Sequence, residues 1–149
     1  MKSVISIKIC SRKAAEKLLR GQFPEGTAVI SFYNPPCTYE SSTPCSHVDY
    51  AGKAERIFQI ALDDFQTSLP EAADLAKFID TAISDGLNII CQCESGQNRS
   101  VGCAAAILEH YCHRGQSVFD SDKYRPDEMV YYSVLDALEK RGRGRVKKH

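Results

Sequence analysis

A short polar loop carries the side chains best suited to chemistry, Cys93-Glu94-Ser95-Gly96-Gln97-Asn98-Arg99-Ser100. A thiol begins the loop, and near its end Arg99 offers a planar guanidinium that can hold two phosphoryl oxygens at once. Backbone N–H groups of such a loop, followed by a helix N-terminus, favour negative charge. The same dipoles stabilise a thiolate, so we expect the pKa of Cys93 to be lowered. The loop therefore predicts phosphoryl transfer through a cysteinyl phosphate.

The elements around the loop predict one α/β domain. Apolar runs predict strands at residues 4–9, 27–32, 56–62 and 88–92, and helical periodicity predicts helices at 11–20, 68–86, 100–113 and from 126. Ser11 and Gly21 are expected to cap the first helix, and Ser68-Leu69-Pro70-Glu71 reads as a capping box. Alternating strands and helices predict a mainly parallel central sheet of four to five strands, flanked by helices on both faces. The loop after a central strand is where such sheets bind ligands.

The loop resembles the signature of the protein tyrosine phosphatase superfamily, in particular its small dual-specificity-like members and their bacterial relatives. That signature is His-Cys-(five residues)-Arg-Ser/Thr. Cys93, Arg99, Ser100 and the internal Gly96 match it, whereas Gln92 stands where the family has histidine. The resemblance implies a phosphatase II-like fold and no metal or other cofactor. It also implies that Cys93 is the nucleophile, that Arg99 and the backbone of residues 94–99 bind the phosphate, and that Ser100 hydrogen-bonds the leaving sulfur.

A phosphate ester also needs a proton for its leaving group. In small members of this family an aspartate supplies it, about thirty positions before the cysteine and after a strand. Asp63 and Asp64 stand there, and we favour Asp64 because relatives use the later residue of such a pair. If neither serves, Glu40 or Asp49 in the long loop at residues 33–53 would be the acid.

Three functions remain open at this point. The first is a phosphomonoesterase that hydrolyses phosphotyrosine, with phosphoserine and phosphothreonine as further substrates in a shallow site. The second is a phosphate-binding pseudophosphatase, which the departure at Gln92 favours. The third is a phosphatase of RNA 5′ ends or another non-protein phosphate ester; Glu94 and the lack of lysine in the loop argue against multiply phosphorylated substrates. The expected partner is accordingly a phosphorylated protein or a small phosphate ester.

Seven cysteines without a signal peptide predict reduced thiols and a cytoplasmic protein. No apolar run reaches the roughly 20 residues of a membrane helix. Cys37, Cys45 and His47 are too loosely spaced for a zinc site. Cys91 is either a core residue or a partner that forms a disulfide with Cys93 under oxidation.

The composition predicts one catalytic domain followed by a basic tail. Residues 1–139 form the expected catalytic domain, within which a long loop at 33–53 offers Tyr33, Tyr39 and Tyr50 as aromatic walls of the site. The formal net charge is zero, yet residues 140–149 carry six Lys or Arg and no acid. We expect this tail to be disordered; it is either a solvated end that aids solubility, the interpretation we favour, or a contact for nucleic acid, acidic membrane or an acidic partner.

Overall fold

A computed structural model describes residues 5–34, 48–50, 52–62 and 66–146, and within them a parallel four-stranded sheet. The strands are β1 (Ile7–Cys10), β2 (Thr27–Tyr33), β3 (Arg56–Ala61) and β4 (Asn88–Gln92), in the spatial order β1-β4-β2-β3. The helices are α1 (Arg12–Arg20), α2 (Ala72–Ser84), α3 (Arg99–Cys112), α4 (Gln116–Phe119) and α5 (Glu128–Val146). This architecture confirms the predicted fold class.

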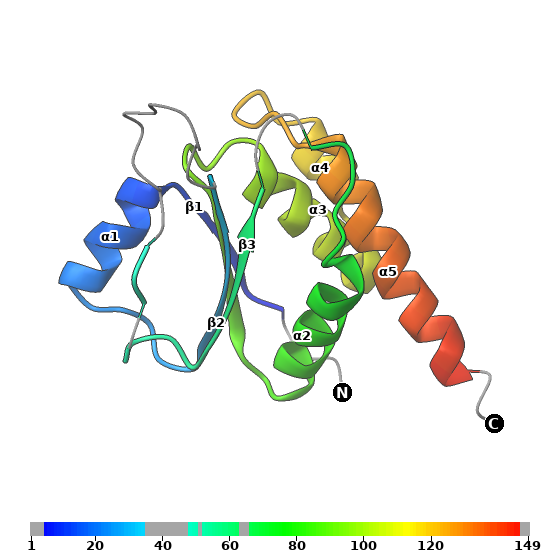
Figure 1. Cartoon of the computed structure of the whole chain (residues 1–149), viewed down its shortest axis with the longest axis horizontal. Helices are drawn as coiled ribbons and strands as arrows, with labels where there is room; N and C mark the ends of the chain where they lie inside the picture. The colour runs from blue at the N-terminus through cyan, green and yellow to red at the C-terminus, as the bar shows by residue number, and fades with distance from the viewer. Residues whose placement is uncertain (1–4, 35–47, 51, 63–65, 147–149) are drawn as a thin grey trace.

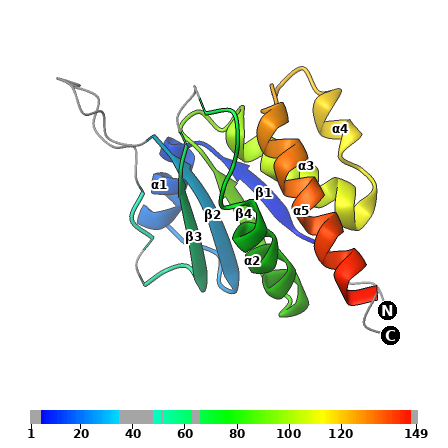
Figure 2. The same ribbon diagram turned by 45° about the vertical axis from the view of Figure 1, so that its right-hand side comes forward.

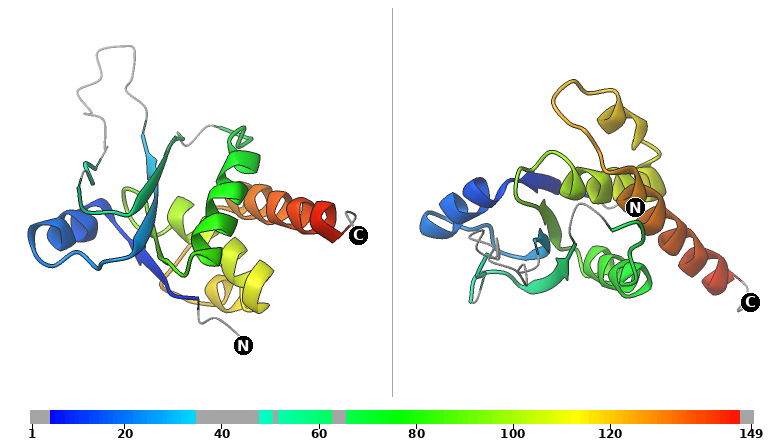
Figure 3. Two further views of the ribbon diagram at one scale, coloured as in Figure 1. Left: turned by 90° about the horizontal axis from the view of Figure 1, so that it is seen from below. Right: turned by 45° about the horizontal axis from the view of Figure 1, so that its top comes forward.

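The two faces of the sheet are covered unequally. Helix α1 lies on one face, and α2, α3 and α5 cover the other (Figures 1 and 3). The alternation of side chains along β4 explains why nearly the whole strand is apolar. Ile89 and Cys91 enter the larger core under α2, α3 and α5, while Ile90 enters a smaller core under α1. A strand buried on both faces needs apolar residues at successive positions.

The caps predicted for α1 are confirmed. The side chain of Ser11 accepts a hydrogen bond from the Ala14 N–H at 3.1 Å. The N–H of Gly21 donates to the carbonyl oxygen of Lys17 at 3.1 Å. Both signals are local, because they involve only neighbouring residues in the chain.

The capping box predicted at residues 68–71 is wrong. Helix α2 begins at Ala72, and its N-cap residue Glu71 makes no side-chain cap hydrogen bond. The Ala72 N–H instead donates to the carbonyl oxygen of Leu69 at 3.1 Å. A turn through Pro70 therefore satisfies the first helical donor, and Ser68 has no capping role.

The C-terminal helix begins and ends later than the sequence suggested. Asp127 accepts a hydrogen bond from the Val130 N–H at 3.1 Å and so caps α5. The helix packs along α2 and α3 (Figure 2) and continues to Val146, into the segment that we expected to be a disordered tail. Ion pairs of Lys140 with Asp136 and of Arg141 with Asp80 favour this extension. Helix α4 was not predicted, since four residues carry too little periodicity.

In the part of the chain that the structure describes, no helix combines the length and the hydrophobicity that crossing a bilayer requires.

Candidate active site

The carboxyl ends of all four strands lie along one edge of the sheet, and each is followed by a residue of the candidate site. Arg12 follows β1, Asn34 follows β2 and Leu62 follows β3. The Cys93–Ser100 loop follows β4, which lies between β1 and β2. Parallel pairing thus gathers at one place residues that are far apart in the sequence.

On one side, the loop is fixed to the junction of β1 and α1. The Cys93 N–H donates to the carbonyl oxygen of Cys10 at 3.2 Å, and the Arg12 N–H donates to that of Glu94 at 3.1 Å. Gly96 has a φ of +70°, and a Cβ atom there would lie 2.7 Å from the backbone nitrogen of Ser11. Only glycine tolerates both this conformation and this approach.

On its other side, the loop is fixed to the segment that precedes α5. The N–H groups of Arg125 and Asp127 donate to the carbonyl oxygens of Gln97 and Asn98 at 2.9 and 3.0 Å. The Asn98 side chain donates back to the Arg125 carbonyl oxygen at 2.8 Å. Backbone hydrogen bonds to its carbonyl oxygens on both flanks therefore hold the loop in its shape.

Cys93 lies at the base of this loop, and its side chain is buried. Its sulfur is 3.1 Å from the Ser100 hydroxyl oxygen. Burial raises the pKa of the Cys93 thiol. Hydrogen bonds from the Ser100 hydroxyl and from the backbone N–H groups of Ser100, Asn98 and Gly96 outweigh it, so the net pKa is lowered. The loop therefore favours a thiolate at this position.

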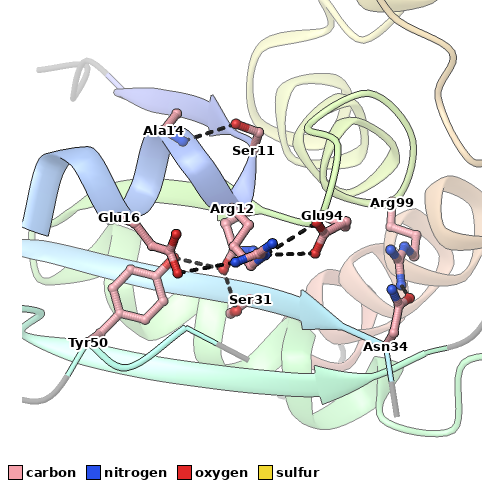
Figure 4. Close-up of polar contacts among 10 residues, drawn as sticks. Ser11, Arg12, Ala14, Glu16, Ser31, Asn34, Tyr50, Glu94 and Arg99 are labelled. Atoms are coloured by element: carbon pink, nitrogen blue, oxygen red, sulfur yellow. Dashed lines mark hydrogen bonds and ion pairs between the residues drawn. The ribbon is translucent and has the colours of Figure 1, made fainter. Parts of the chain in front are cut away.

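Arg99 is the first residue of α3 and is 7% exposed. One of its terminal nitrogens donates to the side-chain oxygen of Asn34 at 2.9 Å (Figure 4). The same nitrogen donates to the carbonyl oxygen of Leu62. Both partners are neutral, so neither cancels the charge of the guanidinium. Sequence reasoning missed Asn34; its only signal was a polar residue two positions after the second predicted strand.

Gln92, in the position of the family histidine, is fully buried. Its side-chain oxygen accepts hydrogen bonds from the hydroxyls of Ser31 at 2.6 Å and Tyr50 at 2.8 Å. Its amide nitrogen finds no hydrogen-bond partner among the residues that the structure describes. The residue directly before Cys93 is thus held by two hydroxyl donors, one from Ser31 and one from Tyr50.

Tyr50 is not an aromatic wall of the site, in contrast to the expectation from the sequence. It is 1% exposed and belongs to the smaller core under α1. Burial, chiefly, raises the pKa of its phenol, so the hydroxyl stays protonated and available to donate to Gln92. Tyr33 ends β2 and is partly buried.

Cys91 packs in the larger core and contacts Cys103. A hydrogen bond between the thiols of Cys91 and Cys103, and then burial, raise the pKa of Cys91 well above its ordinary value, as expected of a core thiol.

Several predicted residues lie outside the described part of the chain: Cys37, Tyr39, Glu40, Cys45, His47, Asp63 and Asp64. Asp49 is described and is exposed on the surface. Within the described residues, no three His, Cys, Asp or Glu side chains gather as a metal site requires.

Comparison with solved structures gives matches along nearly the whole chain. DUSP15 matches with a TM-score of 0.61 at 14% sequence identity, over 96% of this chain and 92% of that chain. Tk-PTP in its active form matches with a TM-score of 0.58 at 16% identity, over 91% and 92%. Human DUSP28 matches with a TM-score of 0.56 at 16% identity, over 95% and 96%. At these identities the matches establish the fold of dual-specificity and tyrosine phosphatases.

No curated protein matches the chain. The family model of the Rit1 DUSP-like domain matches residues 55–148, a stretch that includes β3, β4, the whole Cys93–Ser100 loop and the helices packed behind it. Since this match spans more than half of the sequence, the chain belongs to the family of Rit1 DUSP-like domains.

Proposed function

We propose that the chain is a cysteine-dependent phosphomonoesterase that hydrolyses phosphotyrosine and, in a shallow site, phosphoserine and phosphothreonine. One observation carries this proposal: the Cys93 sulfur is hydrogen-bonded by Ser100 and by backbone N–H groups of the loop, which lower its pKa. A buried thiol with a lowered pKa has little structural use, but it is what a nucleophile at neutral pH requires.

The proposed first step transfers the phosphoryl group to sulfur. The Cys93 thiolate attacks phosphorus in line, an S–P bond forms, and the ester P–O bond breaks. Arg99 and the N–H groups of residues 94–99 bind the three equatorial oxygens. Protonated Asp64 gives its proton to the departing alkoxide or phenoxide; Asp63 is the alternative acid.

In the second step water cleaves the S–P bond. The Asp64 carboxylate takes the proton of water, inorganic phosphate leaves, and the Ser100 hydroxyl donates to the sulfur as it regains its negative charge. Arg99 also holds the carbonyl oxygen of Leu62, the residue directly before Asp63. This bond ties the proposed phosphate-binding arginine to the residue that precedes the candidate acids in the sequence.

The first test is hydrolysis of an aryl phosphate by the wild-type chain and by Cys93→Ser. We expect turnover in the wild type and none in the variant, with unchanged thermal unfolding, because a serine alkoxide does not form at neutral pH. Equal activity of the two proteins would refute the covalent mechanism.

A phosphate-binding protein without turnover is the second candidate, and the unsatisfied amide nitrogen of Gln92 favours it. Gln92→His distinguishes the two functions. An enzyme weakened by the glutamine should hydrolyse aryl phosphates faster with histidine, whereas a pure binding protein would bind inorganic phosphate and stay inactive in both forms.

The mechanism requires a reduced thiol, and Cys10, Cys91, Cys93, Cys103 and Cys112 are free cysteines in the structure. We therefore propose a cytoplasmic location, where thiols are kept reduced. The basic residues after Glu139 remain the proposed contact for an acidic partner or nucleic acid.

A further inference from the structure

The candidate phosphate-binding loop contains a carboxylate of its own. Glu94 is the single acid between Cys93 and Ser100, and it directly follows the nucleophile. A carboxylate that turned toward the site would repel both a thiolate and a phosphate dianion. A loop built for anions therefore needs a means of keeping this side chain away.

Arg12 contacts Glu94 through both its backbone and its side chain. The Arg12 N–H donates to the Glu94 carbonyl oxygen at 3.1 Å. Its Nε atom lies 3.0 Å and 3.2 Å from the two carboxylate oxygens of Glu94. Figure 4 shows the Glu94 carboxylate pointing toward Arg12.

The arginine is itself held in place. It is the first residue of α1, directly after the capping residue Ser11, and it contacts Glu16 one turn later at 3.4 Å. The side chains of Arg12 and Glu94 are 34% and 40% exposed. An ion pair this exposed contributes little to the stability of the fold. We therefore expect its main effect to be on the orientation of the Glu94 side chain in the loop.

We propose that Arg12 is a positioning residue of the phosphate-binding loop, which holds the Glu94 carboxylate turned away from the bound anion. This inference rests on the proposed function, because it assumes that the loop binds a phosphate. It assigns a role to α1, which the family match at residues 55–148 does not include.

A double-mutant cycle with Arg12→Met and Glu94→Gln tests the proposal. The first readout is the pKa of Cys93, taken from thiolate absorbance as the difference between each protein and the same protein carrying Cys93→Ser. The second is the affinity for inorganic phosphate. Arg20→Met, at the other end of α1, is the control that removes one positive charge from the same helix.

We expect Arg12→Met to raise the pKa of Cys93 by about half a unit to one unit and to weaken phosphate binding about three- to tenfold. Glu94→Gln keeps the backbone N–H of this position and removes only the side-chain charge. Its effect should therefore be much smaller in the wild type than in the Arg12→Met background, where it should reverse most of the loss. This unequal effect is the signature of positioning, because independent charges would add.

Equal effects of Glu94→Gln in both backgrounds would overturn the proposal, as would an Arg12→Met protein that behaves like the Arg20→Met control. If Arg12→Met does not fold, Arg12→Lys enters the same cycle, with the same unequal effect expected on a smaller scale. If the wild type neither hydrolyses aryl phosphates nor forms phosphocysteine, the proposed function fails; the thiol titration would still decide the role of Arg12.

Discussion

At the scale of single residues, the Cys93 thiol is subject to opposing effects. Burial disfavours its charged form, and hydrogen bonds from the loop and from Ser100 favour it more strongly. The reactive form is the thiolate, which predominates above the pKa of the group. A change that weakens these hydrogen bonds should therefore move activity to higher pH.

Ser100→Ala removes the hydroxyl that lies 3.1 Å from the Cys93 sulfur. Because this hydrogen bond lowers the pKa of Cys93, its loss should raise that pKa and shift the acidic limb of the kcat/KM profile to higher pH. Breakdown of the cysteinyl phosphate should also slow, giving a burst of product before steady turnover. Stopped-flow measurement across pH checks both; an unshifted limb would mean that the backbone donors alone set the pKa.

Asp64→Asn tests the proposed general acid. An acid matters most when the leaving group is poor, so hydrolysis of phosphotyrosine should slow by about 10²–10⁴-fold, far more than that of an ester with an activated leaving group. The alkaline limb of the pH profile should disappear, because that limb reports the acid losing its proton. Asp63→Asn is the control on the same loop and should cost little; the reverse pattern would assign the role to Asp63.

At the scale of elements, the loop is held between the start of α1 and the segment before α5. Gly96 makes the closest approach on the first side, with φ at +70° and Ser11 directly against it. Gly86 has nearly the same φ, +76°, with no atom within 4 Å of the position of a Cβ. Comparing the same substitution at these two glycines therefore separates the effect of backbone strain from that of steric contact.

Gly86→Ala should cost roughly 1–2 kcal/mol of stability, from the left-handed conformation alone, and should keep its activity. Gly96→Ala carries the same strain and must also displace the loop from Ser11. We expect it to lower aryl-phosphate hydrolysis strongly. Urea unfolding and steady-state kinetics of both variants check this, and similar activity in the two would show that the loop tolerates the displacement.

Around Cys93 and α1, although not at the start of α2, the sequence predicted the features that depend on neighbouring residues. The strand, loop and helix around Cys93 and the caps of α1 are local patterns, and the structure has them where they were expected. Asn34 and Arg12 could not be placed in the same way. Their contacts depend on the strand order β1-β4-β2-β3, which hydrophobic periodicity does not encode. For the same reason, Tyr50 was wrongly predicted to be an aromatic wall of the site, whereas it lies buried under α1.

At the scale of the whole molecule, α5 closes the larger core and extends past the domain boundary suggested by composition. Arg141 lies beyond that boundary, yet its Nε atom is 3.0 Å from a carboxylate oxygen of Asp80 on α2. Asp80 is 5% exposed and also accepts a hydrogen bond from Tyr111. The basic segment is thus partly a structural element.

Arg141→Met should lower the free energy of unfolding by about 1–3 kcal/mol, because it leaves a buried carboxylate with one partner fewer. A chain that ends at residue 139 should lose at least as much. Lys140→Met, whose ion pair with Asp136 is exposed, is the control and should change little. Equal unfolding free energies for the wild type and these three variants would show that residues 140–146 do not stabilise the domain.

The central claim is that phosphate passes through the Cys93 sulfur, and detection of that intermediate tests it most directly. The wild-type chain is mixed with an aryl phosphate, quenched in acid within milliseconds, and digested for mass spectrometry. We predict one added phosphoryl group on the peptide that contains Cys93, retained longer in Ser100→Ala and absent in Cys93→Ser. Turnover with no phosphoryl group on Cys93 at any quench time, or with one on another residue, would contradict the account.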